Sequence, residues 1–391
     1  MEPHAFNLRH LRATIAIVEG GSISAAVRAV NLTQPAITQG IAKLESQLGT
    51  ALFHRQAGGM TPTEAGQILA ARAAAALRLI GSPRATSAQI RAFLALAAAG
   101  SYAGAALATG LSEASLHRAV SDLSLGVGQR LVERRGKSVL LTARGLAFLR
   151  RLRLAVSELR SAIEELAALD GRDAGRLVIG AMPLSRARLL PRAVVGFHAA
   201  HPQADITIVE GSHAELVGPL RDGEIDMMVG ALRPPEGNED LAQRPLFVDR
   251  PVILGRREHP IAREGDGATL ATLAQYPWIV SAPGTPLHDR WKLLFESAGI
   301  PVPPVQIACG SVMMVRQILV ESDFLTLLSF DQVSVEIEAG WLVRIADPPR
   351  DISRTIGVTT RADWRPTRLQ ARFLDQLGAN AAEIGLAEHD S

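Results

Sequence analysis

Four polar side chains near the start of the chain recur at the spacing of one helical face. They are Gln34, Thr38, Gln39 and Lys43. The opposite face of the same predicted helix is apolar and carries Ile37, Ile41, Leu44 and Leu48. A glutamine amide can pair with adenine through two hydrogen bonds, and a threonine hydroxyl can bond a base or a phosphate. The pattern therefore predicts a helix that contacts nucleic acid, against the alternative of a polar face that only meets solvent.

The segments around this helix favour a helix-turn-helix. Apolar residues at helical spacing predict helices over residues 8–19, 23–30 and 34–48. Thr33 can cap the third helix, and Pro35 fits its first turn, where a missing N–H costs nothing. In such a unit the first residues of the third helix reach base edges in the major groove. Residues 51–55 then suit a strand, which places Arg55 for a phosphate contact.

The helix-turn-helix segment occurs twice. Residues 12–66 repeat without a gap 79 positions further on, over residues 91–145. About 14 of the 55 aligned positions are identical, including glycines and a Thr–Gly step that alanine richness does not explain. We expect two tandem winged helix-turn-helix domains, at residues 6–66 and 85–145, separated by a connecting helix and break over residues 67–84.

The second copy keeps the fold signals but changes the polar face. At the equivalent positions it carries Glu113, Ala114, His117, Arg118 and Asp122. Arg118 can contact guanine or phosphate, with His117 beside it, and Arg134 lies in a basic wing. Glu113 would meet phosphates badly unless it accepts from cytosine. Two interpretations stay open: both modules bind DNA, or the second has become a packing and dimerisation element.

The net charge of +2 hides an asymmetry between the two parts of the chain. Residues 1–169 carry 19 Lys and Arg against 10 Asp and Glu, whereas residues 170–391 carry 22 against 29. A basic first part suits a polyanion, because neutralising phosphates releases condensed counterions. Charge asymmetry is also common among multidomain proteins, so it supports the prediction without deciding it.

A long linker helix is predicted over residues 146–169. Its apolar residues alternate three- and four-residue steps, the pattern of a coiled-coil seam. They are Leu149, Leu152, Val156, Leu159, Ile163 and Leu166. We expect the last five to form a dimer helix that pairs two chains. A single amphipathic helix lying on its own domain would show the same stripe.

Residues 174–380 are predicted to form an α/β domain, after a linker at residues 170–175. Strand-like segments at 176–180, 205–210 and 226–230 alternate with helix-like segments at 189–200 and 214–222. This alternation favours parallel sheets with crossover helices. In sheets of this kind, ligands bind at the carboxyl ends of the strands.

The first helix-turn-helix resembles the LysR-type transcriptional regulators. The likeness is carried by Thr-Gln-Pro-Ala-Ile-Thr at residues 33–38, Leu48-Gly49, Leu52-Phe53, Arg55 and Thr-Glu-Ala-Gly at residues 63–66. The resemblance implies base or backbone contacts from Gln34, Pro35, Thr38 and Gln39, and a phosphate contact from Arg55. It covers residues 6–378 apart from the second module, since members of this family ordinarily have one. The long helix is where subunits of the family pair.

The resemblance also implies a fold for the second half. It is expected to be an effector domain of the periplasmic-binding-protein type, with two α/β lobes, a cleft, and a crossing between lobes at residues 247–252. Segments 276–280, 321–325 and 361–364 resemble a subgroup named for regulating a galactose-binding protein. The fold class is therefore α/β overall: two tandem all-α winged helix-turn-helix domains, a linker helix and a two-lobed effector domain.

Three strand-to-helix loops would face this cleft. Their hydroxyls, Ser185, Thr285 and Ser311, are the expected effector contacts, and Gly230 would allow close approach. Hydroxyls and free backbone N–H groups at helix N-termini suit carboxylate or sugar oxygens. Ordinary helix capping is the alternative role of each hydroxyl.

No enzymatic chemistry is predicted, and we expect neither a cofactor nor a bound metal. The sequence has no Gly-rich phosphate loop with lysine and no nucleophile elbow. His198 and His201 lack a third metal ligand at a recognisable spacing. The second half has only Lys292 for a Schiff base, which disfavours a pyridoxal-phosphate body.

The sequence thus predicts a ligand-responsive, DNA-binding transcriptional regulator. The alternatives are a solute-binding module, which explains only the second half, and a second head that serves only dimerisation. Expected partners are double-stranded DNA, a sugar or small organic acid as effector, further copies in a homodimer or homotetramer, and RNA polymerase. A single cysteine, Cys309, and the lack of an export signal or long apolar run indicate a cytoplasmic protein without membrane contact.

Overall fold

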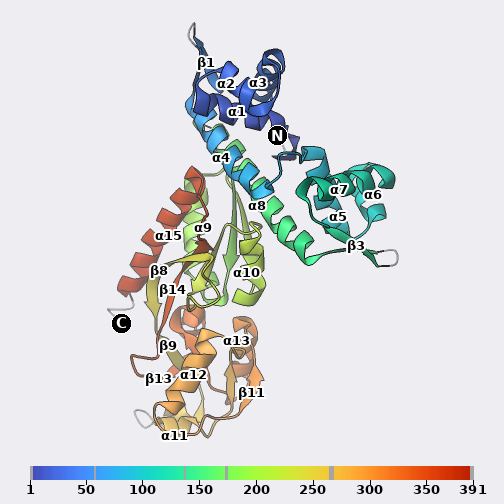
Figure 1. Cartoon of the computed structure of the whole chain (residues 1–391). Coiled ribbons are helices and arrows are strands. Elements are labelled where there is room, and N and C mark those ends of the chain that lie inside the picture. Colours follow the sequence, from blue (N-terminus) through green and yellow to red (C-terminus); the bar gives the residue numbers. More distant parts are fainter. Residues whose placement is uncertain (1–2, 57–58, 136–137, 172–174, 264–267, 388–391) are drawn as a thin grey trace. The chain divides into compact units, whose positions relative to one another are not determined.

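The computed structural model describes residues 3–56, 59–135, 138–171, 175–263 and 268–387, and it divides into two compact units (Figure 1). Unit 1 contains residues 1–176 with 221–224, and unit 2 contains residues 177–220 with 225–391. Unit 1 is helical with two small hairpins, and unit 2 is α/β. The predicted fold class is confirmed.

The first head of unit 1 is a winged helix-turn-helix. It consists of η1 (Pro3–Ala5), α1 (Leu8–Gly20), α2 (Ile23–Val30), α3 (Gln34–Leu48), β1 (Phe53–Gln56) and β2 (Gly59–Pro62). The hydroxyls of Ser22 and Thr33 cap α2 and α3 by accepting from backbone N–H groups at 3.1 and 3.4 Å. Between these helices Asn31 takes a left-handed conformation with φ 52°, which ends α2 and turns the chain into α3.

The second head repeats the first with no change in register. It consists of α5 (Ser87–Ala99), α6 (Tyr102–Thr109), α7 (Glu113–Val127), β3 (Val132–Arg135) and β4 (Ser138–Leu141). Each of these elements begins and ends 79 residues after its counterpart in the first head. Ser101 and Ser112 cap α6 and α7 as Ser22 and Thr33 cap α2 and α3. The ungapped repeat seen in the sequence is therefore a structural repeat.

A threonine and a glycine that stand three residues apart recur in both copies, at the place where each wing joins the helix behind it. Thr63 accepts from the N–H of Gly66 at 3.0 Å and so caps α4 (Glu64–Ile80). A Cβ on Gly66 would lie 2.1 Å from the carbonyl oxygen of Leu52, so no side chain fits there. Thr142 and Gly145 repeat this arrangement at the start of α8 (Ala143–Leu169), with a hydrogen bond of 2.9 Å.

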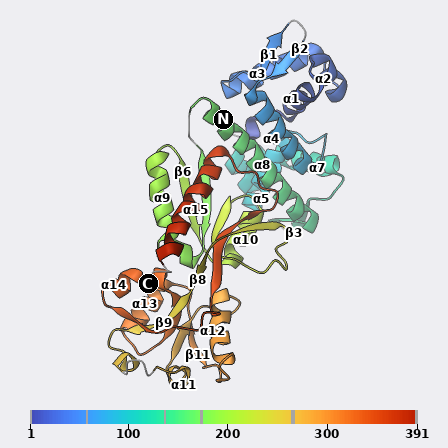
Figure 2. The ribbon, with the colours of Figure 1, turned by 90° about the vertical axis from the view of Figure 1, so that its left-hand side faces the viewer.

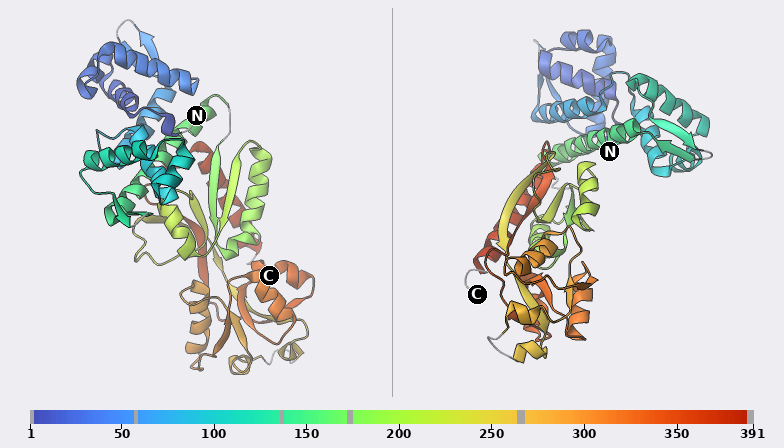
Figure 3. Two further views of the ribbon diagram at one scale, coloured as in Figure 1. Left: turned by 90° about the vertical axis from the view of Figure 1, so that its right-hand side faces the viewer. Right: turned by 60° about the horizontal axis from the view of Figure 1, so that its bottom comes forward.

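Helices α4 and α8 pack against each other within the chain and run antiparallel (Figure 3, right). Arg72, in the middle of α4, bonds Glu158 and Glu165 in the second half of α8. Ile80, at the end of α4, shares a pocket with Leu152 in the first half of α8. The order of contacts is thus reversed along the two helices. One hydrophobic core extends through both heads and both helices.

Within the chain, the predicted coiled-coil seam of α8 packs against α4, and pairing of two chains through this helix stays a prediction. Leu152, Leu159 and Leu166 are buried in the core that α8 shares with α4, and Val156 and Ile163 are half-buried. Apolar periodicity determines which face of a helix is covered, but it does not identify the covering helix.

Unit 2 has two lobes, and the first is built on a five-stranded sheet of order β6-β5-β7-β14-β8 (Figure 2). The strands are β5 (Arg176–Ala181), β6 (Asp205–Glu210), β7 (Met227–Ala231), β8 (Leu241–Asp249) and β14 (Arg354–Arg361). Strands β5 and β7 are parallel, and β14 is antiparallel to β7 and β8. The helical elements are η2 (Pro183–Arg186), α9 (Leu189–Ala200), α10 (His213–Arg221) and α15 (Arg368–Ala387). Phe197 of α9 meets Phe373 of α15 edge-on at 5.2 Å.

The second lobe contains a three-stranded and a two-stranded sheet. Its strands are β9 (Pro251–Arg256), β10 (Trp278–Val280), β11 (Val305–Ala308), β12 (Thr326–Ser329) and β13 (Leu342–Ala346). Its helical elements are η3 (Pro260–Arg263), α11 (Leu270–Leu273), α12 (Pro286–Glu296), α13 (Val312–Val320), η5 (Phe330–Val333) and α14 (Ser334–Glu338). Trp278, Trp291 and Phe295 pack ring against ring in its core. The chain crosses between lobes at Arg250, from β8 to β9, as the resemblance implied.

No single helix among the described residues combines the length and apolar composition of a membrane span. Helices α5 and α6 reach this length and composition only when they are taken together, and the pair is bent by 120° at its junction.

Candidate nucleic-acid interface and effector site

The first candidate surface is the outward face of α3. Its exposed residues include Thr33, Gln34, Pro35, Gln39 and Lys43. Thr38 is half-buried, and its hydroxyl donates to the carbonyl of Gln34 at 3.0 Å. The other face of α3 is anchored by Ile37, Ile41 and Leu44, which are at most 1% exposed. The glutamine amides are therefore presented to the outside on a rigid helix.

His10 supports α3 from behind, and the sequence analysis missed it. A Cβ on Gly40 of α3 would lie 2.8 Å from the His10 ring, so the glycine lets α1 and α3 approach closely. Burial, followed by the charge of Lys43, lowers the pKa of His10 below its ordinary value. The ring is therefore neutral near pH 7. The packing signal in the sequence is Gly40 itself, inside an otherwise regular helix.

The wing is tied to α3 through Glu45. Its carboxylate accepts from the N–H groups of Leu52 and Phe53 at 2.9 and 3.4 Å. Arg55 stands in β1, paired with Met60 of β2. The side chains of Arg55 and Arg134 lie outside the described part of the structure, so their phosphate contacts stay predictions.

The second candidate surface is the outward face of α7. Glu113, Ala114, His117 and Arg118 are exposed and line an open groove together with Tyr102 and Ser121. The rings of Tyr102 and His117 lie 5.3 Å apart. Leu116, Val120 and Leu123 anchor the helix from the other side. The second head thus presents its polar face as openly as the first, with different chemistry.

In unit 2, two of the predicted effector contacts lie at the carboxyl ends of neighbouring parallel strands. Ser185 follows β5, and Gly230 is the next-to-last residue of β7. Ser185 is fully buried, and its hydroxyl donates to the carbonyl of Met182 at 2.9 Å. A Cβ on Gly230 would lie 2.5 Å from the Cβ of Met182, so the glycine allows this loop to pack closely. The structure brings the two residues together around Met182.

The other two predicted effector contacts follow the neighbouring strands β10 and β11. Val280 and Ala308 are paired in parallel, so the loops behind them share one edge of the second lobe. Thr285 caps α12 and Ser311 caps α13, by accepting from backbone N–H groups at 3.3 and 3.4 Å. Thr285 is half-buried, and Ser311 is exposed.

Two arginines that the sequence analysis missed lie where the lobes meet. Arg354 Nε donates to Asp249 at 2.6 Å, and Ser329 donates to the same carboxylate from the other lobe. Arg233 Nη1 donates across to the carbonyl of Gly284 at 3.1 Å. Among the described residues, Arg233 Nε and Arg354 Nη2 are buried without a hydrogen-bond partner.

Arg233 and Arg354 belong to adjacent backbone segments, because the N–H of Leu232 donates to the carbonyl of Thr355 at 2.9 Å. Burial lowers the pKa of Arg233 most, Asp289 opposes that shift, and the positive charge of Arg354 lowers it further. Both groups nevertheless stay charged, since arginine does not deprotonate in proteins. Two half-buried cations, each with one buried N–H donor that has no partner among the described residues, can hold an anion, because charge-assisted bonds to a carboxylate would satisfy both donors. Arg233 lies two residues after the end of strand β7, and that position was the signal available in the sequence.

A further ion pair joins the lobes beside these arginines. Arg188 Nη1 lies 2.8 Å from Asp331 Oδ1, and Gln332, the next residue, has a buried Oε1 without a partner among the described residues. The junction between the lobes is therefore polar and includes unsatisfied donors and an unsatisfied acceptor.

Comparisons with known families agree with this geometry. The family description "Bacterial regulatory helix-turn-helix protein, lysR family" matches twice, over residues 8–67 and 87–146. The description "LysR substrate binding domain" matches residues 170–382. Among solved structures, ArgP from Mycobacterium tuberculosis has a TM-score of 0.60 at 19% identity, covering 75% of this chain and 96% of that one. CbnR complexed with its target DNA has a TM-score of 0.55 at 21% identity, covering 75% and 99%.

Curated relatives carry the likeness along the chain. The HTH-type transcriptional regulator GalR of Pseudomonas putida is 31% identical over 369 residues, which cover 91% of this chain and 92% of GalR. The SDS degradation transcriptional activation protein of a Pseudomonas species is 34% identical over 280 residues, covering 70% and 89%. With the family's helix-turn-helix present twice and its substrate-binding domain behind, this chain belongs to the LysR family of ligand-responsive, DNA-binding transcriptional regulators, a family without enzymatic activity.

Proposed function

We propose that the chain binds promoter DNA through the outward faces of α3 and α7 and responds to a small organic acid held between the lobes of unit 2. The observation that carries the effector part is the pair of half-buried arginines, Arg233 and Arg354, each with one buried N–H that has no hydrogen-bond partner among the described residues. The DNA part is supported by the exposed amides of α3 on a firmly packed helix.

For DNA binding, each exposed group of the first head has a role. Gln34 and Gln39 donate to and accept from base edges, with adenine as the preferred base. Thr33, Pro35 and Thr38 lie against the backbone or base edges at the helix start, and Lys43 and Arg55 contact phosphates. In the second head, His117 and Arg118 reach the groove and Arg134 contacts a phosphate.

For the effector, the charge of the site favours a carboxylate over a neutral sugar. Two guanidinium groups can form charge-assisted bonds with one carboxylate, which a sugar hydroxyl does not match in strength. Ser185, Gly230, Thr285 and Ser311 would shape the rest of the cleft through the loops that they occupy. The acid would bridge the lobes, because Arg233 and Arg354 belong to the first lobe while Gly284 belongs to the second.

The proposed mechanism follows from that bridging position. An acid that contacts both lobes binds the closed arrangement better than an open one, so it shifts the population toward closure. Closure then changes subunit packing and the spacing or angle of the heads on DNA. In this proposal the chain also forms homodimers or homotetramers, works with RNA polymerase at the promoter and acts in the cytoplasm.

A thermal-shift screen tests the effector class. Small mono- and dicarboxylates are compared with their amides, which keep the shape without the charge, and with neutral sugars. We expect stabilisation by at least one acid and not by its amide. Arg233→Gln should weaken the binding of that acid by about 10- to 150-fold, since a hydrogen bond to a charged group contributes about 1.5–3 kcal/mol. Arg350→Gln is the matched control, because Arg350 is an exposed residue of the same unit. Stabilisation by sugars alone would contradict the proposed acid.

DNA binding is tested by gel shift of the full-length chain on its own promoter region across a range of salt concentrations. A retarded complex that survives competition by unrelated duplex supports the proposal. No retardation at any salt concentration contradicts it.

A further inference from the structure

The two heads and their connecting helices form an internal repeat whose two members pack on each other. Helices α1, α2 and α3 and strands β1 and β2 of the first head each have a counterpart that begins and ends 79 residues later. The connecting helices α4 and α8 are counterparts too, since they begin at Glu64 and Ala143. Two copies of one unit joined through antiparallel helices are expected to be related by an approximate two-fold axis.

Contacts between α4 and α8 follow that symmetry. Arg72 of α4 reaches Glu158 and Glu165 in the later part of α8. Its counterpart on α8 is Arg151, which lies at the end of α4, with Nη2 3.6 Å from the position of a Cβ on Gly81. Equivalent arginines therefore occupy reciprocal places on the two helices, as they would in a symmetric dimer interface.

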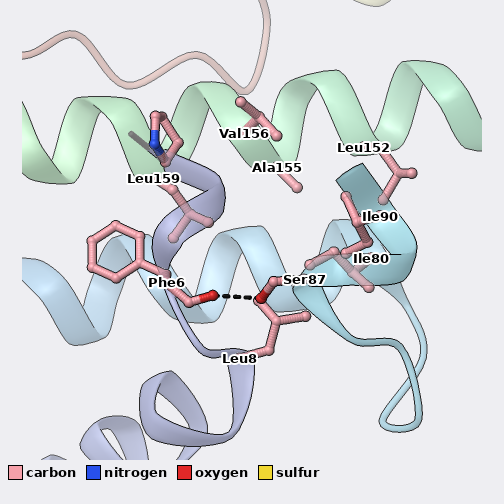
Figure 4. Close-up of a pocket in the computed structure, with 10 residues that line it drawn as sticks. Phe6, Leu8, Ile80, Ser87, Ile90, Leu152, Ala155, Val156 and Leu159 are labelled. Atoms are coloured by element: carbon pink, nitrogen blue, oxygen red, sulfur yellow. Dashed lines mark hydrogen bonds between the residues drawn. The ribbon is translucent and has the colours of Figure 1, made fainter. Parts of the chain in front are cut away.

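An apolar pocket marks the place where equivalent surfaces meet (Figure 4). Its lining includes both members of two pairs that are 79 residues apart, Leu8 with Ser87 and Ile80 with Leu159. Ser87, at the start of the second head, donates its hydroxyl hydrogen to the carbonyl of Phe6, at the start of the first. Together with the shared core, these contacts fix the two heads in one unit.

The two recognition helices in this unit do not present the same side chains. Gln34, Thr38, Gln39 and Lys43 of α3 are replaced on α7 by Glu113, His117, Arg118 and Asp122. An amide pairs best with adenine and a guanidinium with guanine, whereas a carboxylate accepts from cytosine. Lys43 of α3 suits a contact with a phosphate, whereas its counterpart on α7, Asp122, does not suit one. No single half-site sequence satisfies both helices.

We infer that one chain acts as a covalently joined pair of heads that recognises an asymmetric DNA site with two half-sites of different sequence. The inference rests on the proposed contacts of α3 and α7 with DNA. A homodimer with identical recognition helices requires a palindromic site, because the symmetry of the protein is mirrored in the duplex. Here the fold supplies the approximate symmetry and the side chains remove it. The first half-site presents adenine to Gln39, and the second presents guanine to Arg118.

Joining the heads in one chain also makes the two contacts depend on each other. Once one head is bound, the other is held at a high effective concentration near its half-site. Both half-sites are therefore needed for full affinity, although each head reads its own sequence.

Selection of duplexes from a random pool by the full-length chain, followed by footprinting, tests the inference. We expect two dissimilar motifs at a fixed spacing. Gln39→Ala should reduce discrimination by about 5- to 150-fold at one position of the first motif alone. Arg118→Ala should do the same in the second motif alone. Both side chains are exposed, so thermal unfolding of both variants should match the wild type.

A swapped chain gives the sharper test. It carries Glu113→Gln, His117→Thr, Arg118→Gln and Asp122→Lys, so that α7 presents the polar residues of α3. This chain should select the first motif twice, as an inverted repeat, and lose its preference for the wild-type site.

The outcomes separate this inference from the proposed function. Selection by the wild-type chain of one motif only, whether single or as an inverted repeat of itself, or unchanged selection by Arg118→Ala would overturn the asymmetric site and leave DNA binding by the first head intact. If the wild-type chain selects no sequence at all, the proposed function itself fails.

Discussion

Arg72 and Glu165 are 93 residues apart in the chain, and they form a two-bond ion pair in the folded protein. Arg72 Nε lies 3.0 Å from Glu165 Oε2, and Nη2 lies 3.0 Å from Oε1. Nη1 reaches Glu158 at 3.2 Å. The arginine side chain is only 6% exposed, so water screens these bonds weakly. One guanidinium thus joins the connecting helix of the first head to that of the second.

Replacing Arg72 should therefore loosen the pairing of the two heads. Arg72→Ala leaves two carboxylates facing α4 without a cation, and the loss of one partner of a buried pair costs about 3 kcal/mol. We expect a lower urea midpoint for unit 1 and faster amide exchange in both α4 and α8. Arg78→Ala removes an exposed arginine from the same helix and should change the unfolding free energy by at most about 0.5 kcal/mol. Equal losses from both variants would show that the ion pair does not hold the helices together.

The glycine behind each wing gives a prediction that applies equally to both heads. A Cβ at Gly66 or Gly145 would lie 2.1 or 2.0 Å from a backbone carbonyl oxygen, which cannot move without shifting the wing. Gly66→Ala and Gly145→Ala should each destabilise their own head by about 1–3 kcal/mol in chemical denaturation.

Gly126→Ala is the control for these two variants. This glycine lies within α7, where the nearest atom to an added Cβ would be 3.7 Å away. Alanine there should stabilise the helix by up to about 1 kcal/mol. If all three variants behave alike, close packing is not the reason for the glycines behind the wings.

Gln39 and Lys43 should differ in how their removal affects DNA binding. Gln39→Ala removes a base contact, so specific binding should fall by about 1–3 kcal/mol at one base position. Lys43→Ala removes a phosphate contact, so binding to every sequence should weaken alike. Titrations at several salt concentrations would show the salt slope smaller by about 0.9 for the lysine variant and unchanged for the glutamine variant. Identical salt slopes in all three proteins would argue against a phosphate contact from Lys43.

A buried histidine predicts how the stability of unit 2 depends on pH. His259 Nδ1 accepts from the N–H of Ile261 at 3.2 Å, and Nε2 donates to the carbonyl of Asp323 at 3.1 Å. These bonds require the neutral ring, and burial lowers the pKa of His259 below its ordinary value, against a smaller opposing effect of Asp323. As the pH falls below about 6.5, the unfolded chain takes up this proton before the folded one does. The unfolding free energy should then decrease, by at most about 1.4 kcal/mol per pH unit for one proton.

The measurement is urea denaturation at several pH values between 7.5 and 5.5. His259→Gln cannot take up this proton, so its unfolding free energy should fall less steeply across the range than that of the wild type. Parallel curves for the two proteins would assign the pH dependence to other groups, such as His10.

The local parts of the fold were predictable because their signals lie close together in the sequence. Ser22 and Thr33 stand directly before the helices that they cap, and Pro35 follows at the one place where a helix accepts it. The duplicated heads were predictable for a second reason: the same Thr–Gly step recurs at a constant distance, and each copy meets the same packing demand.

The partners of buried groups could not be predicted in the same way. The leucine seam of α8 indicated a covered face, yet only the folded chain shows that α4 covers it. Arg233 and Arg354 are far apart in sequence and become neighbours only when β7 and β14 pair. Ser185 was expected to contact an effector because of its loop, but its burial depends on Met182 and the strands on both sides. Such contacts follow from tertiary packing, which local periodicity does not contain.

The intrachain pairing of α4 with α8 has a consequence for cells that hold few copies of this regulator. A dimer of single-headed chains dissociates on dilution, so the concentration of the two-headed dimer falls with the square of the protein concentration. Here the two heads are made together on the ribosome and stay together however scarce the protein becomes. If one chain binds both half-sites, as inferred above, occupancy of the operator should scale in direct proportion to copy number.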